Sequence, residues 1–69
     1  MHEIRILEFL RKNGESELRM IAKNIRVPEV VVRQEVERLK EKGYIVVEGD
    51  KVKISKKGAK ELLKYVKGI

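Results

Sequence analysis

The residues of this sequence with the most usable chemistry are its lysines and arginines, and they are unevenly distributed. The 69 residues include 17 Lys and Arg against 11 Asp and Glu, which gives a net charge of +6. Residues 49–69 hold seven basic and two acidic residues, whereas residues 29–48 have a net charge of −1. A basic segment of this kind attracts polyanions, so nucleic acid is the first partner to consider.

Nucleophiles, acid–base pairs and metal ligands are scarce by comparison. The chain has no cysteine, which excludes disulfides and thiolate metal sites. His2 is the single histidine and cannot form a metal site alone. Ser16 and Ser55 are the only serines, and both are predicted to cap helices. No glycine-rich phosphate loop occurs. The sequence therefore predicts no enzyme, no metal site and no cofactor.

The first two thirds of the chain predict three helices, because apolar residues recur there at helical spacing. Any binding residues in this part of the chain are positioned by these helices. Residues 2–14 predict a helix that ends at Asn13-Gly14. Residues 15–25 predict a short helix that begins after Ser16 and ends near Asn24, which tolerates left-handed backbone. A third helix is predicted from Pro28 to about residue 42, with a core stripe formed by Val32, Val36 and Leu39.

The last third of the chain predicts a β-hairpin and a helix. Residues 45–54 predict two strands joined by a two-residue turn at Gly49-Asp50. Four apolar residues then share one face of the hairpin: Ile45, Val47, Val52 and Ile54. Ser55 is placed to cap a final helix over residues 56–69. The apolar stripe of that helix is formed by Ala59, Leu62, Leu63, Val66 and Ile69.

Two stretches carry a resemblance to a known family. The first comprises the apolar positions of the second and third helices, followed by Lys-Gly-Tyr-Ile at residues 42–45. The second is Val-Lys-Ile-Ser-Lys-Lys-Gly at residues 52–58. Together they resemble the winged helix-turn-helix of small prokaryotic regulators, and the second is similar to the multiple-antibiotic-resistance regulator group. The resemblance covers residues 1–69 and implies one α+β, mainly α domain: a three-helix core, a hairpin wing and a C-terminal helix.

The resemblance also implies that the third helix lies in the major groove of double-stranded DNA and that the wing contacts the DNA backbone or minor groove. On that helix Gln34 can pair with adenine, Arg33 or Arg38 with guanine or phosphate, and Val30 with a thymine methyl group. The helix is nearly neutral, however. An alternative is therefore that Val30 and Val31 form an apolar patch for a protein partner in a larger assembly.

The lysines of the wing and of the final helix provide a second set of candidate contacts. Lys51, Lys53, Lys56 and Lys57 are predicted to bind phosphates regardless of the DNA sequence, with Lys60 farther along the final helix as an addition to this set. Apolar residues on the first helix are spread more widely than one core stripe needs, which favours a second contact with another helix or subunit. The expected homodimer contact consists of Ile6, Phe9, Leu62, Val66 and Ile69.

The composition indicates where such a protein works. Abundant Lys, Glu, Arg, Ile and Val, with two Asn, one Gln and no Cys, favour a thermophilic source. No apolar run is long enough to span a membrane, and no signal-peptide pattern is present. A cytoplasmic, nucleoid-associated protein in transcription regulation or chromatin is therefore expected, with no membrane partner.

Overall fold

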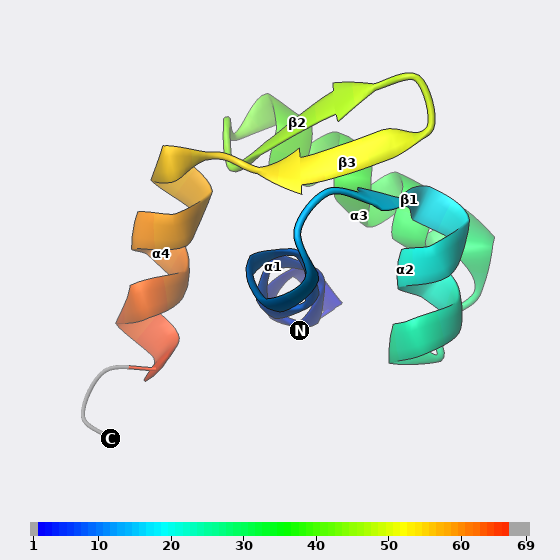
Figure 1. Cartoon of the computed structure of the whole chain (residues 1–69), viewed down its shortest axis with the longest axis horizontal. Coiled ribbons are helices and arrows are strands. Elements are labelled where there is room, and N and C mark those ends of the chain that lie inside the picture. The colour runs from blue at the N-terminus through cyan, green and yellow to red at the C-terminus, as the bar shows by residue number, and fades with distance from the viewer. Residues whose placement is uncertain (1, 67–69) are drawn as a thin grey trace.

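The computed structural model of the chain describes residues 2–66, with side chains to residue 65 (Figure 1). The expected order of helices and hairpin is confirmed, with one short strand added. The helices are α1 (His2–Asn13), α2 (Leu18–Ile25), α3 (Glu29–Glu41) and α4 (Lys56–Val66), and the strands are β1 (Ser16–Glu17), β2 (Ile45–Glu48) and β3 (Lys51–Ile54). This arrangement is a winged helix-turn-helix, mainly helical and of the α+β class.

Helix α1 lies at the centre of the fold, between α2 and α4 and on one side of the sheet (Figure 1). Every described element except β1 contributes a residue to the core around it. The predicted stripe of α3 is confirmed, because Val32, Val36 and Leu39 are all buried. Removal of this apolar surface from water is the main stabilising term for the fold. The largest fully buried side chains are Ile6, Leu7, Leu10, Ile21, Val32, Leu39, Val52 and Leu62.

The hairpin has the predicted register, with Ile45 opposite Ile54 and Val47 opposite Val52. Strand β1, which was not predicted, pairs antiparallel with β3, so the sheet order is β1-β3-β2. The backbone N–H of Leu18 then donates a hydrogen bond of 3.0 Å to the carbonyl oxygen of Asp50. The wing tip is therefore fixed to the start of α2.

Two predictions about the ends of α2 are wrong. Ser16 does not cap this helix, because it pairs in β1 and its hydroxyl donates to the carbonyl oxygen of Gly14. The N-cap residue is Glu17, which makes no side-chain cap. The left-handed residue is not Asn24 but Arg26, with φ 59° and ψ 48°. Its backbone N–H bonds to the carbonyl oxygen of Ala22, which ends α2 and starts the turn toward α3.

Helix α4 is capped by Ser55 as predicted, since the Ser55 hydroxyl accepts a hydrogen bond of 3.0 Å from the backbone N–H of Gly58. Its apolar stripe is narrower than expected. Leu62 is fully buried against α1, but Leu63 is 50% exposed. The side chain of Val66 and all of Ile69 lie outside the described residues. Within residues 2–66, every helix is too short or too polar to cross a membrane.

Candidate nucleic-acid interface

The candidate interface begins with the side of α3 that faces away from the core. Val30 and Gln34 are one helical turn apart, on the opposite side from the stripe formed by Val32, Val36 and Leu39. Val30 is 63% exposed, and Arg33, Gln34 and Arg38 are also exposed. These four predicted contact residues therefore share the exposed surface of α3.

Ion pairs hold both arginines of this surface. Arg33 Nη2 lies 3.0 Å from Glu29 Oε2, one helical turn earlier, and Arg38 Nη1 lies 3.0 Å from Glu35 Oε2. The side chains of Arg33 and Arg38 remain 61% and 58% exposed, so their other N–H groups are free to donate to a ligand. Exposed pairs of this kind contribute little stability, and their main effect is to orient the guanidinium groups.

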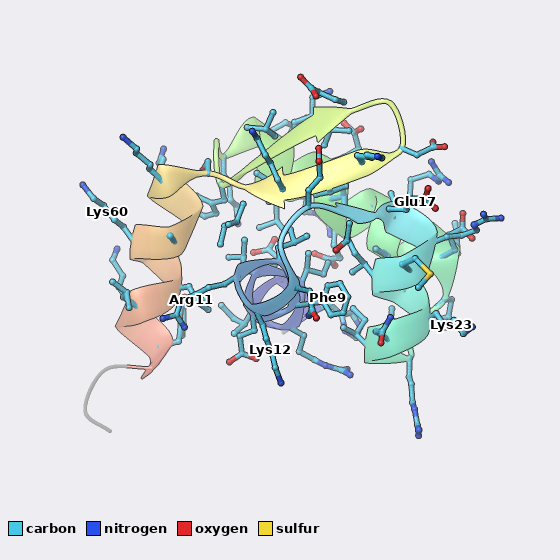
Figure 2. All side chains as sticks on the ribbon, viewed as in Figure 1. Phe9, Arg11, Lys12, Glu17, Lys23 and Lys60 are labelled. Carbon is cyan, nitrogen blue, oxygen red and sulfur yellow. The ribbon has the colours of Figure 1, made fainter. Side chains whose placement is uncertain are left out.

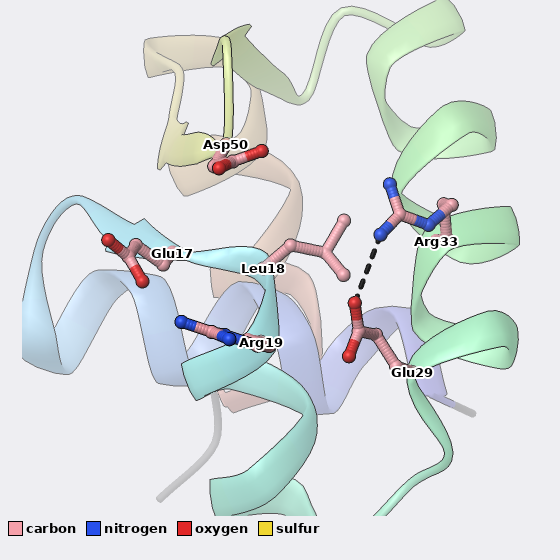
Figure 3. A pocket seen from close by; sticks show the side chains of 6 residues that line it. All are labelled: Glu17, Leu18, Arg19, Glu29, Arg33 and Asp50. Carbon is pink, nitrogen blue, oxygen red and sulfur yellow. Dashed lines mark hydrogen bonds and ion pairs between the residues drawn. The ribbon is translucent and has the colours of Figure 1, made fainter.

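A groove lies between the start of α2, the first half of α3 and the wing tip (Figure 3). Its polar lining has three carboxylates and two guanidinium groups: Glu17, Glu29, Asp50, Arg19 and Arg33. In Figure 3 the Arg33 guanidinium points into this space toward Glu29, and Asp50 lies above it at the wing tip. Carboxylates accept hydrogen bonds from cytosine amino groups and repel phosphates. The groove is therefore better suited to base edges than to the DNA backbone.

The wing carries its lysines on the solvent side of the sheet. Lys51 and Lys53 alternate with Val52, which is fully buried, so both extend from the same exposed face of β3. Lys51 lies opposite Glu17 of β1 and Glu48 of β2 in the register of the sheet. Its charge is thus partly balanced by nearby carboxylates. The charge of Lys53, which faces Val46 of β2, has no such neighbour in that register.

The first turn of α4 brings Lys56 and Lys57 to the surface beyond the base of the wing. Lys57 Nζ lies 5.6 Å from the ring centroid of Tyr44, the second residue after the C-cap of α3. This cation–π contact ties the lysine to the end of α3. Farther along α4, a hydrogen bond and ion pair with Glu61 raise the pKa of Lys64 above its ordinary value.

The exposed apolar pair proposed as a protein-binding patch is not present as such. Val31 is half-buried and packs against the core, which leaves Val30 as an isolated exposed valine. Single exposed apolar residues are common on protein surfaces. The structure therefore gives the protein-partner alternative a much smaller surface than the sequence indicated.

Three of the expected dimer residues have side chains that the structure describes, and all three pack at least partly within the chain itself. Ile6 and Leu62 are fully buried in its own core. Phe9 is half-buried at the groove between α1 and α2. The exposed apolar side chains nearest to the expected contact are Leu63 and Tyr65 of α4. The homodimer stays a prediction, and neither Leu63 nor Tyr65 is among the residues expected to form its contact.

Sequence reasoning also missed Arg19 and the carboxylates around it. Arg19 is the second residue of α2, exposed and on the groove that Arg33 lines. Glu17 and Asp50 come together there only because β1 pairs with β3 and Leu18 bonds to Asp50. The sequence signal for this site was Arg19 itself, a charged residue at the start of α2.

The fold is shared with solved structures of two bacterial proteins. The first is BpsR of Bordetella bronchiseptica, whose DNA binding is regulated by 6-hydroxynicotinic acid, with a TM-score of 0.88 and 24% identity. The second is YusO of Bacillus subtilis, with a TM-score of 0.85 and 20% identity. Each match covers 93% of this chain and 50% of the other, so the chain spans about half the length of these proteins. No protein-family model and no curated protein sequence matches the chain. At these identities the likeness establishes the fold alone, a winged helix-turn-helix.

Proposed function

We propose that this chain is a single domain that binds double-stranded DNA in a transcription-regulatory or chromatin-associated role, with no catalytic activity. In this proposal α3 enters the major groove. The observation that supports it most directly is the free surface of α3, on which Val30, Arg33 and Gln34 face away from the core. The DNA binding of BpsR, which has the same fold, also supports it.

The proposed affinity comes chiefly from phosphates contacted outside α3. Helix α3 and its flanks are nearly neutral, and the groove at its start is lined by three carboxylates. The exposed lysines of β3 and α4 supply the positive charge that α3 lacks: Lys51, Lys53, Lys56 and Lys57. Phosphate contacts position a protein on DNA, while base contacts select the sequence. The two tasks are thus assigned to different elements of the fold.

The first test is a titration of a random-sequence duplex of about 30 base pairs at two salt concentrations. Four phosphate contacts predict that affinity falls roughly 100-fold between about 50 and 200 mM salt. Binding that is insensitive to salt would contradict the assignment of the lysines. No binding at low salt would reject the DNA proposal and favour a protein-interaction module, with Val30 as the first residue to change.

We further propose that the protein acts as a homodimer formed through α1 and α4. Leu63 and Tyr65 are 50% and 60% exposed, and Tyr65 lines a shallow, largely apolar depression with Ile4 of α1. Burial of these side chains against a second copy would remove apolar surface from water. Sedimentation equilibrium of the free protein should give the mass of a dimer. A monomer at concentrations that saturate DNA would contradict this part of the proposal.

A further inference from the structure

The exposed side of α4 carries a row of three lysines, and the proposed contact with one duplex uses only the first of them, Lys56. Lys56, Lys60 and Lys64 are spaced by four residues, so they follow one another along the same side of the helix. We call these three residues the lysine row. Leu62, which is fully buried, marks the opposite side of α4, which packs on α1. The row extends for about 12 Å along the helix axis.

The row is electrostatically unfavourable for α4 taken by itself. The first turn of the helix contains Lys56 and Lys57 and no acidic residue, although this end of a helix favours negative charge. Like charges four residues apart also repel one another. Within residues 2–65, Lys64 is the one member of the row with an acidic partner, Glu61 at 3.1 Å. A polyanion bound along the row would remove both unfavourable terms.

The row starts near the junction of α4 with the end of α3 and leads away from it along α4. Helix α4 lies at one end of the longest axis and packs on α1, whereas α2 lies at the other end, with α3 packed against it (Figure 1). Figure 2 shows Lys60 projecting from α4 away from the body of the protein. We therefore expect a straight duplex that lies on α3 to reach Lys56 and to leave Lys60 and Lys64 free.

We infer that the lysine row is a second surface for double-stranded DNA, so that one protomer holds two duplex segments. This inference rests on the DNA binding proposed above. Lysines act as point charges that suit phosphates and read no bases, which fits a second, sequence-independent contact. Tyr65 is the exposed aromatic side chain beside the row, and a single ring offers little stacking surface for a run of unpaired bases, which argues against a single strand. The apolar side of α4 is occupied by α1 through Leu62, so no wide apolar face is free to enter a membrane.

The test uses the full chain and two duplexes, one fixed to beads and the other fluorescent. The wild-type protein should capture the fluorescent duplex on the beads. The double variant Lys60→Gln with Lys64→Gln should capture at least fivefold less, while its affinity for a single duplex changes less than about twofold. Both side chains are exposed, and unchanged circular dichroism checks that the fold is intact.

The matched control is Lys12→Gln with Lys23→Gln, which removes the same charge from α1 and α2 (Figure 2). It should capture the second duplex as well as the wild type does. An equal loss in this control would assign the effect to net charge and overturn the second surface.

Two other results would also overturn it. The first is wild-type protein that binds one duplex and never captures another, which leaves the proposed function intact. The second is capture that persists in the Lys60→Gln, Lys64→Gln variant, as expected if a dimer joins two duplexes through its two α3 surfaces. Wild-type protein that binds no duplex at all rejects the proposed function itself, and the second surface with it.

Discussion

The backbone of Gly58 in α4 passes so close to the carbonyl oxygen of Tyr44 that a Cβ atom at Gly58 would lie 2.1 Å from it. The same carbonyl oxygen accepts a hydrogen bond of 2.9 Å from the backbone N–H of Ser55. The Ser55 hydroxyl in turn donates to the carbonyl oxygen of Gly43. The end of α3 and the start of α4 are thus joined at one point, which fixes the base of the wing relative to the candidate interface.

This close approach predicts that Gly58→Ala destabilises the protein. Alanine favours helices over glycine by about 1 kcal/mol, but the added methyl group would collide with backbone that cannot move freely. We expect a net loss of about 2–3 kcal/mol in the free energy of unfolding, measured by urea denaturation. Gly14→Ala is the comparison, because it has open space but φ +80°, and it should lose about 1–2 kcal/mol. A Gly58→Ala variant as stable as the wild type would disprove the close approach.

The two serines allow a second test of the junction between wing and α4. Ser55→Ala removes the hydroxyl that caps α4 and bonds to Gly43, so it should reduce the free energy of unfolding by about 1–2 kcal/mol. Ser16→Ala removes one hydrogen bond to Gly14 and no helix cap, so it should cost about 0.5 kcal/mol or less. Thermal unfolding of the two variants side by side gives the difference. Equal losses would show that Ser55 is no more important than an ordinary surface serine.

The parts of the fold that were predicted correctly follow from patterns that are local in sequence. The stripe of Val32, Val36 and Leu39 fixes the buried side of α3, and therefore which residues of α3 are free. The hairpin register follows because a shift by one residue would mix its apolar and polar faces. The candidate DNA-contact residues on α3 and β3 are exposed, as these two patterns require, and Lys56 and Lys57 of α4 are exposed as well.

The features that were missed depend on contacts between distant segments. Strand β1 is two residues long, too short for any periodicity, and exists because it pairs with β3. Arg26 adopts the left-handed conformation because the turn between α2 and α3 requires it there, whatever the residue prefers. Leu63 fits the apolar stripe of an isolated helix, but α1 covers only the side that carries Leu62. The carboxylate-lined groove likewise has no counterpart in sequence spacing.

The groove predicts an unusual effect for Glu29→Gln. This change removes a negative charge at the start of α3 and releases Arg33 from its ion pair. Affinity for random-sequence duplex should rise roughly 2- to 5-fold, because less charge opposes the phosphates. Preference for a selected site should fall, because the Arg33 guanidinium is no longer oriented. Fluorescence anisotropy with both duplexes measures the two effects. Glu8→Gln on α1 is the control. An equal rise in affinity in that variant would show that the effect comes from the net charge of the protein and not from the position of Glu29.

Replacing Gln34 and replacing the wing lysines should reduce DNA affinity in two different ways, the first only on a preferred sequence and the second on every sequence. Gln34 is exposed on the free side of α3, where its amide can pair with adenine, so Gln34→Ala should weaken a preferred site roughly 5- to 100-fold and leave random DNA unchanged. Lys51→Glu with Lys53→Glu should weaken every sequence and flatten the dependence on salt, because these side chains are assigned to phosphates. Titrations of a selected and a scrambled duplex at two salt concentrations separate the two patterns. Equal losses on both duplexes from Gln34→Ala would remove its role in reading bases, and α3 would then serve only to position the domain.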